Sequence, residues 1–291
     1  QLFPQCRPLL IGSLPHADHS EAADLIFDYT PEFPLWPQLP MYKEEGMIQQ
    51  YLEGFPAVDD CDGKLFIDGN SPEFDAEVLA FYEEYLMITE GGAPLDGSRF
   101  ALSEKSARGF YVFLEAAAQK KETFISLKGQ TTGPVTFCTG LVDQDNRDIY
   151  YDDQLRDIGI KHLGLKARWQ TQKMAEVGGT PIMFFDEPAL AGLGTSAYIT
   201  ITQQDIVQCL SEVFTGVKEE GGLTGVHVCA NTEWPVLFDA GVDIISYDAY
   251  SYFDRLVLYG EQLVDFFERG GLLATGIIPT SPEYIETESV E

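Results

Sequence analysis

A histidine and a cysteine stand two residues apart at the end of an apolar run, in the segment GVHVC at residues 225–229. Side chains at positions i and i+2 of a β-strand point to the same side, so the His227 imidazole and the Cys229 thiolate would converge on one point. Zinc in proteins prefers nitrogen and sulfur ligands. We therefore predict that His227 and Cys229 are catalytic residues and metal ligands. A buried histidine beside a buried cysteine is the alternative.

A carboxylate, Asp248, follows the next apolar run at residues 242–247. If the two runs are neighbouring parallel strands, Asp248 lies beside the His-x-Cys pair and supplies an oxygen ligand to the same zinc ion. Aspartate is also common at strand-to-helix turns, so a capping role for Asp248 is the alternative.

Two acids, Asp186 and Glu187, come directly after the apolar run 181–185. Burying a carboxylate costs free energy unless it is paired or functional, and acids at a strand end suit a substrate ammonium group. We predict that Asp186 binds substrate in this way. A salt bridge to Lys128 on a neighbouring strand is the alternative.

Two further turns combine flexible backbone with polar groups: KGQTTGPVTF from Lys128 and IGSLPH from Ile11. We predict that Gln130 lines the substrate pocket and that Gly12 and Ser13 bind a carboxylate through N–H and hydroxyl groups. Tight turns without a ligand are the alternative for both segments.

The rest of the sequence predicts a scaffold that brings these strand ends together. Short apolar runs alternate with amphipathic stretches, a pattern typical of βα units around a parallel sheet. We predict seven strands, at residues 8–11, 33–36, 123–127, 181–185, 223–228, 242–247 and 271–274. The predicted helices cover residues 20–29, 73–89, 104–119, 154–177, 203–218 and 259–269, with Ser20 and Thr202 as N-caps.

The length of 291 residues fits a single TIM barrel domain over residues 1–291, because (β/α)8 barrels have about 250 residues. Residues 41–70 are less regular and predict a β-rich insertion with a hairpin turn. A closed barrel needs an eighth strand, yet few residues follow the seventh predicted strand. We therefore expect the last βα unit to be missing from this chain.

The composition excludes several classes of partner. With 18 Lys and Arg against 47 Asp and Glu, the formal net charge is −29, which repels nucleic-acid backbones and anionic membrane surfaces. No run of about 18 apolar residues predicts a membrane span. Five scattered cysteines make a poor disulfide framework and favour a reducing compartment, so we expect a cytoplasmic protein.

Taken in order, IGSLPH, KGQTTGPVTF, FFDEPAL, GVHVC and VDIISYD resemble the motif series of the C-terminal barrel of cobalamin-independent methionine synthase, in the uroporphyrinogen decarboxylase-like superfamily. The resemblance covers most of the chain and is closest to the short core type of this family. It implies a TIM barrel and a zinc-dependent methyltransferase acting on a thiol such as homocysteine. By position, His227 and Cys229 would bind zinc, Asp248 would replace a glutamate ligand, and Gly12, Ser13 and Asp186 would hold the amino-acid end of the thiol.

Three positions depart from the family pattern. The family has a fourth ligand, a cysteine on the last strand, but no cysteine follows Cys229, and Cys138 could substitute only if the geometry allows. Gln49 stands where the family has a glutamate for the substrate amino group. Thr280 replaces a histidine that helps protonate the departing folate nitrogen, which favours a methylcorrinoid over methyl-folate as donor, because cobalt leaves without a proton.

The resemblance leaves other functions open. Methyl transfer to coenzyme M uses the same zinc chemistry on a related barrel. The non-enzyme alternative is a barrel that binds a corrinoid or a thiol, or acts as a partner subunit, without catalysis. A corrinoid protein is the partner that a protein-bound methyl donor implies. Uroporphyrinogen decarboxylation is disfavoured, because an octa-acidic substrate needs several arginines near the mouth of the barrel and the N-terminal region offers only Arg7.

Overall fold

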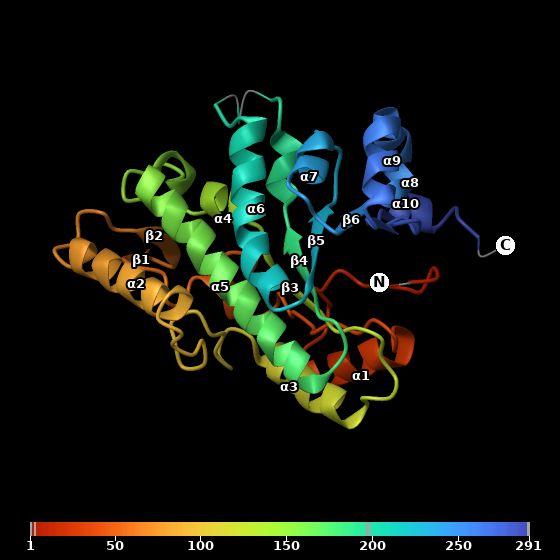
Figure 1. The fold of residues 1–291 in the computed structure, drawn as a ribbon, viewed down its shortest axis with the longest axis horizontal. Helices are drawn as coiled ribbons and strands as arrows, with labels where there is room; N and C mark the ends of the chain where they lie inside the picture. The colour runs from red at the N-terminus through yellow and green to blue at the C-terminus, as the bar shows by residue number, and fades with distance from the viewer. Residues whose placement is uncertain (1, 3, 196–197, 199, 290–291) are drawn as a thin grey trace.

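The computed structural model, which describes residues 2, 4–195, 198 and 200–289, has an α/β fold around a five-stranded parallel sheet (Figure 1). The strands follow one another across the sheet in chain order: β3 (Lys128–Thr132), β4 (Ile182–Asp186), β5 (Leu223–Val228), β6 (Ile244–Tyr247) and β7 (Leu272–Thr275). The bounds of β4 to β7 agree with the predicted strands within two residues. The parallel βα arrangement expected from the alternating pattern is thus confirmed.

The third strand lies later in the chain than predicted. Residues 123–127 were expected to form it, but β3 begins at Lys128 and runs through the polar segment KGQTT. All five of its residues are buried, because this strand has protein on both faces. Its polar side chains made it look like a turn in the sequence.

The first two predicted strands, at residues 8–11 and 33–36, form no regular strand. Instead, isolated parallel bridges connect residues in and near these segments. Leu35 pairs with Lys128 of β3, and Ser13 pairs with Gln38. Pro34 and Pro37 lack the N–H donor that a continuous ladder requires. The sheet therefore extends beyond β3 by two irregular segments.

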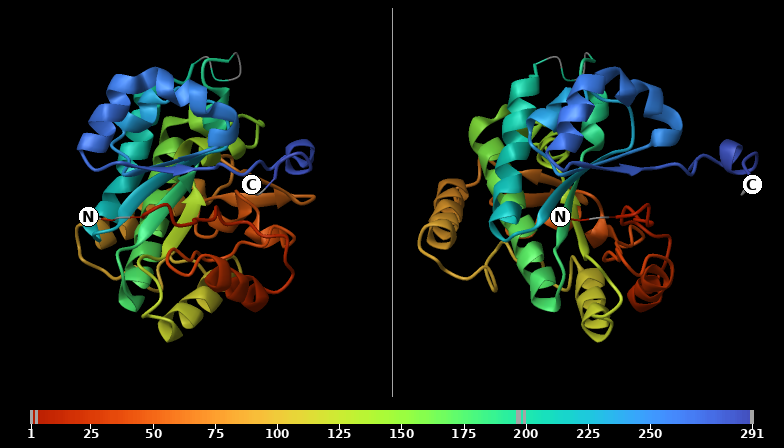
Figure 2. Two further views of the ribbon diagram at one scale, coloured as in Figure 1. Left: turned by 90° about the vertical axis from the view of Figure 1, so that its right-hand side faces the viewer. Right: turned by 45° about the vertical axis from the view of Figure 1, so that its right-hand side comes forward.

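The two faces of the sheet pack into separate apolar cores. The larger core lies between the sheet and helices that include α5 (Asp153–Val177) and α6 (Gln203–Glu219). The opposite face, which we call the inner face, carries a smaller core of Phe33, Ile182, Phe184 and Ile244, against which Leu2 and Leu9 pack. Figure 2 shows the N-terminal segment crossing the sheet on this side.

Most long helices lie where the sequence predicts them: α1 (His19–Tyr29), α2 (Phe74–Thr89), α3 (Arg108–Gln119), α5, α6 and α9 (Gly260–Glu268). Shorter helices that were not predicted are α4 (Pro134–Gly140), α7 (Pro235–Asp239), α8 (Ala249–Leu256) and α10 (Pro282–Ile285). No helix in the described part of the chain is long and apolar enough to cross a membrane.

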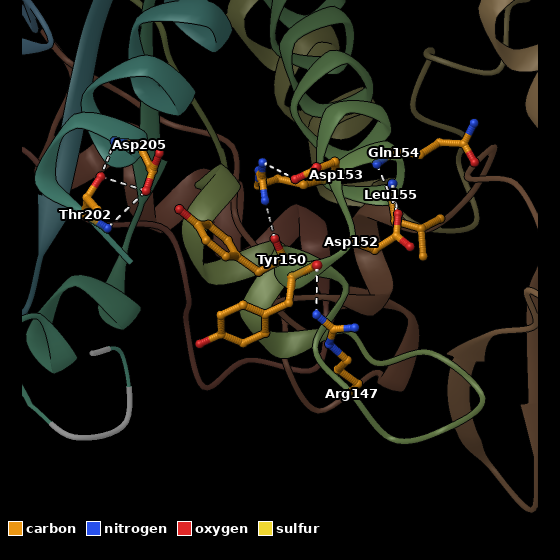
Figure 3. A network of polar contacts seen from close by, with 10 residues as sticks. Arg147, Tyr150, Asp152, Asp153, Gln154, Leu155, Thr202 and Asp205 are labelled. Atoms are coloured by element: carbon orange, nitrogen blue, oxygen red, sulfur yellow. Dashed lines mark hydrogen bonds and ion pairs between the residues drawn. The ribbon is translucent and has the colours of Figure 1, made fainter. Parts of the chain in front are cut away.

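One of the two predicted helix caps is confirmed. Thr202 and Asp205 form a reciprocal capping box at the start of α6, and Asp152 caps α5 nearby (Figure 3). The prediction for α1 was wrong, because Asp18 rather than Ser20 is the N-cap. The Asp18 carboxylate accepts hydrogen bonds from the amides of Ser20 and Glu21 at 2.8 and 3.0 Å.

The predicted β-rich insertion at residues 41–70 contains an antiparallel hairpin of β1 (Val58–Cys61) and β2 (Lys64–Ile67). Its two turn residues, Asp62 and Gly63, have φ angles of 53° and 83°, as a tight hairpin turn requires. The hairpin turn is therefore confirmed. The amide of Ile67 donates to the carbonyl of Val142 at 2.9 Å and ties the hairpin to the rest of the domain.

Lys166 on α5 is fully buried, and burial lowers the pKa of its ammonium group from 10.5 to about 7. Its Nζ lies 3.4 Å from the carbonyl oxygen of Arg99. Because the unfolded chain holds this proton up to a higher pH, the group lowers stability near pH 7, and this loss is recovered as pH rises toward 10.5.

We expect Lys166→Met to raise the free energy of unfolding by about 2 kcal/mol at pH 7, and by less at pH 9.5. Urea denaturation at both pH values measures the difference. Lys161→Met is the matched control on the same helix: Lys161 pairs with Asp157 and Glu212, so its loss should destabilise the protein. A Lys166→Met variant that is less stable than the wild type at pH 7 would contradict this account.

Candidate functional site

Polar side chains form one row across the carboxyl ends of four strands on the inner face. Backbone pairing places Thr132 of β3 beside Asp186 of β4, Asp186 beside His227 of β5, and His227 beside Ser246 of β6. We call these four residues the polar row. Ligands of open α/β sheets and of barrels bind outside the carboxyl ends of the strands. The polar row is therefore the candidate site.

His227 is held by its neighbour in the row. Its Nδ1 lies 3.0 Å from Ser246 Oγ. Burial, with the nearby Lys128 ammonium, lowers the pKa of His227 from 6.5 to about 4, while Asp248 opposes this shift. The imidazole is thus neutral near pH 7, as a metal-binding or proton-accepting histidine must be.

Cys229 is an exposed free thiol immediately beyond β5. Asp248 follows β6 and caps α8, because its carboxylate accepts a hydrogen bond from the amide of Ser251 at 3.1 Å. The structure thus shows the capping role that was the alternative for Asp248. Its carboxylate still lies near enough to His227 to influence the pKa of that residue.

The donor types at this place fit zinc, but the number of grouped donors is small. His227 and Cys229 supply nitrogen and sulfur from one strand end. Within residues 2, 4–195, 198 and 200–289, no three His, Cys, Asp or Glu side chains are grouped closely enough to hold a metal ion. Cys138, considered as a further ligand, is buried in the larger core on the helix side of the sheet.

Asp186 combines burial with an unused hydrogen-bonding atom. Its Oδ1 is enclosed and has no hydrogen-bond partner in the described residues. Burial raises the pKa of Asp186, and the Lys128 ammonium counteracts the rise. Asp186 Oδ1 is therefore a buried acceptor without a donor in the described residues, which marks Asp186 as a candidate polar contact of the site.

Lys128 is 1% exposed and lies at the start of β3 on the inner face. Its ammonium donates to the carbonyl of Ile11, lies 3.4 Å from Gln130 Oε1 and sits 4.8 Å from the centre of the Phe184 ring. Burial lowers the pKa of Lys128, and Asp186 opposes this shift. The two groups interact electrostatically, but the direct salt bridge considered for them is not among the ion pairs of the described residues.

Glu187, by contrast, is used inside the protein. It is fully buried, and its carboxylate accepts hydrogen bonds from Val135 N, Thr136 N and Thr136 Oγ1 at 2.9, 2.8 and 2.6 Å. Gly133 has no room for a side chain, since an added Cβ would lie 2.2 Å from the Glu187 carboxyl carbon. The expectation that both acids suit a substrate ammonium group is therefore corrected for Glu187, which anchors α4.

The predicted carboxylate and pocket residues lie beside the row. Gly12 is buried, and a Cβ there would meet Gln38 Oε1 at 2.8 Å and Gln130 Nε2 at 3.1 Å. Ser13 is exposed. Gln130 is fully buried, and its Nε2 donates to the carbonyl of Trp36 at 2.8 Å, so its side chain connects β3 to the irregular segment around Trp36 in the floor of the site.

Thr132, Ser246 and Tyr51 also belong to this region, although they are not among the predicted site residues. Thr132 and Ser246 carry a signal that could have found them, because each stands at the strand position in register with Asp186 and His227. Tyr51 comes from the insertion, and no local pattern points to its place. Gln49 and Thr280, singled out by the resemblance, are both exposed.

No protein-family model matches the chain, and no curated protein is significantly similar to it.

Proposed function

We propose that this protein is a zinc-dependent methyltransferase that moves a methyl group to a thiol such as homocysteine, on a TIM-barrel scaffold. The observation that supports this best is the neutral His227, held by Ser246 and two residues from the exposed Cys229, at the carboxyl end of a parallel strand. The five motifs that resemble methionine synthase point to the same chemistry.

His227 and Cys229 would hold the zinc ion, and Asp248 would have to move toward this pair to add an oxygen, because no three His, Cys, Asp or Glu side chains of the described residues are grouped closely enough for a metal ion. When bound, zinc would lower the pKa of a substrate thiol and keep it as a thiolate at neutral pH. The contribution of Ser246 is to fix the ring of His227. If Nδ1–H donates to Ser246 Oγ, the lone pair of Nε2 is free for the metal.

Asp186, Gly12 and Ser13 would hold the other end of the substrate. The unpartnered Asp186 Oδ1 suits a substrate ammonium group, and the exposed Ser13 hydroxyl suits a carboxylate. These contacts fix the sulfur relative to the methyl donor, and such positioning accounts for much of the rate enhancement in two-substrate reactions.

We propose a methylcorrinoid, free or carried by a corrinoid protein, as the methyl donor. With such a donor, the substrate sulfur would bond to the methyl carbon as the cobalt–carbon bond breaks and leaves its electron pair on cobalt, so the leaving group would need no proton. Methyl-folate needs a proton on its departing nitrogen. Thr280 stands where the resembled family has the histidine that serves this step. We place the reaction in the cytoplasm.

The test is methyl transfer from methylcobalamin to L-homocysteine and to coenzyme M, with zinc measured in the same protein. Formation of methionine together with bound zinc supports the proposal. Methylation of coenzyme M alone would transfer the function to the rival thiol, and zinc-free protein without any transfer would leave a non-catalytic binding protein.

Asp186→Asn separates the two thiols, because homocysteine carries an ammonium group and coenzyme M does not. We expect the KM for homocysteine to rise about 30-fold, since the variant loses a charge-assisted hydrogen bond to that group. The KM for coenzyme M should change little. Steady-state kinetics with both thiols measures the contrast, and an equal rise for both would exclude Asp186 as the ammonium ligand.

A further inference from the structure

Tyr51 brings the insertion into contact with the floor of the candidate site. It ends the short helix η2 (Gln49–Tyr51), and its side chain is fully buried. Its hydroxyl donates to the carbonyl of Gln130 at 2.9 Å and accepts a hydrogen bond from Gln38 Nε2 at 3.2 Å. The Tyr51 hydroxyl thus connects Gln130 of β3 to Gln38 in the irregular segment that precedes the insertion.

Gln38, which contacts Tyr51 through its side chain, is bonded through its backbone to the turn that contains Gly12 and Ser13. The backbone N–H of Gln38 donates to the backbone carbonyl of Gly12 at 3.1 Å, and the backbone carbonyl of Gln38 accepts from the N–H of Leu14 at 3.0 Å. These two bonds enclose Ser13, which pairs with Gln38 in an isolated parallel bridge. The position of Ser13 therefore depends on where Gln38 is held.

The insertion has further attachments in the same place. Gln50 accepts a hydrogen bond from Gln38 Nε2 and donates through its Nε2 to the carbonyl of Ser106 at 2.7 Å. Thr132 of the polar row donates through Oγ1 to the carbonyl of Met47 at 2.5 Å. Residues 47–51 thus bond both to the polar row and to the segment that carries Ser13.

We infer that Tyr51 is a positioning residue, whose hydroxyl fixes the Gly12–Ser13 turn relative to the polar row and so sets the affinity for the amino-acid end of the thiol substrate. This inference rests on the proposed function for the identity of that substrate. The physical basis is that the Tyr51 hydroxyl serves a donor on Gln38 and an acceptor on Gln130, two buried residues, and a buried polar group that loses its partner costs free energy.

The test compares Tyr51→Phe with Tyr150→Phe. Tyr150 is also buried, but its hydroxyl has no hydrogen-bond partner in the described residues, so its removal breaks no bond. For Tyr51→Phe we expect the Kd for L-homocysteine, measured by calorimetry, to rise about tenfold, with kcat at saturating substrate little changed. Hydrogen–deuterium exchange should accelerate at the amides of Leu14 and Gln38. Tyr150→Phe should behave as the wild type in all three measurements.

An unchanged Kd in Tyr51→Phe, or faster exchange spread evenly over the whole protein, would overturn the inference. If Tyr51→Phe does not fold, Gln38→Met serves instead, because it removes the donor to the same hydroxyl, and the same outcomes decide. Failure of the wild type to bind L-homocysteine rejects the proposed function; the site-specific exchange then decides whether Tyr51 positions Ser13.

Discussion

Replacing Cys229 by serine should remove zinc and thiol methylation together. A serine hydroxyl stays protonated at neutral pH and is a poor zinc ligand, whereas a cysteine binds as the thiolate. We expect zinc affinity to fall at least 100-fold and the methyl-transfer rate about 1000-fold. Metal analysis after dialysis and the methylcobalamin assay measure the two losses.

Cys61→Ser is the matched control, because Cys61 is also an exposed free thiol but lies in the hairpin of the insertion. This variant should keep both zinc and activity. Full zinc content together with full activity in Cys229→Ser would show that Cys229 is not a zinc ligand, since its thiolate would then contribute to neither property.

The carboxyl-end residues could be predicted because they follow runs whose pattern is unambiguous. Residues 223–228 form β5 over the predicted bounds, and this alone places His227 and Cys229 at a strand end. Asp186 is placed by the same reasoning. Alternation along a strand fixes the face of the sheet for His227, which lies inside β5, but not for Cys229, which lies immediately beyond it.

Residues whose roles depend on distant segments could not be predicted. Lys128–Thr132 looked like a turn because its side chains are polar, yet tertiary contacts bury the whole strand. Tyr51 and Gln130 are 79 positions apart in the sequence, and no local pattern near either residue predicts their hydrogen bond. The choice between ligand and helix cap for Asp248 likewise required the position of α8.

Glu187 shows why two adjacent acids were hard to separate from sequence. Asp186 is the last residue of β4 and stands in the polar row, while Glu187 follows it and accepts three hydrogen bonds from the start of α4. The hydroxyl of Thr136 also accepts a bond from the amide of Ala189 at 3.1 Å, so the carboxylate is the centre of a closed network.

We expect Glu187→Ala to lower the free energy of unfolding by about 3–5 kcal/mol, because two buried amides and a hydroxyl lose their acceptor and a cavity remains. Glu187→Gln keeps the shape and one acceptor oxygen and should lose about half as much. Urea denaturation measures both. A Glu187→Ala variant within 1 kcal/mol of the wild type, a margin typical of surface substitutions, would contradict the anchoring role.

The Glu187→Gln variant also tests the charge on this carboxyl. Burial raises the pKa of Glu187 from 4.5 to about 7, so between these pH values the folded protein binds a proton that the unfolded chain has released. Stability from this group is therefore present below about pH 4.5 and is lost as the pH rises to about 7. The stability of the wild type relative to Glu187→Gln should fall over this range. A difference that stays constant from pH 4.5 to pH 7 would show that the buried carboxyl titrates normally and that the α4 hydrogen bonds offset its desolvation.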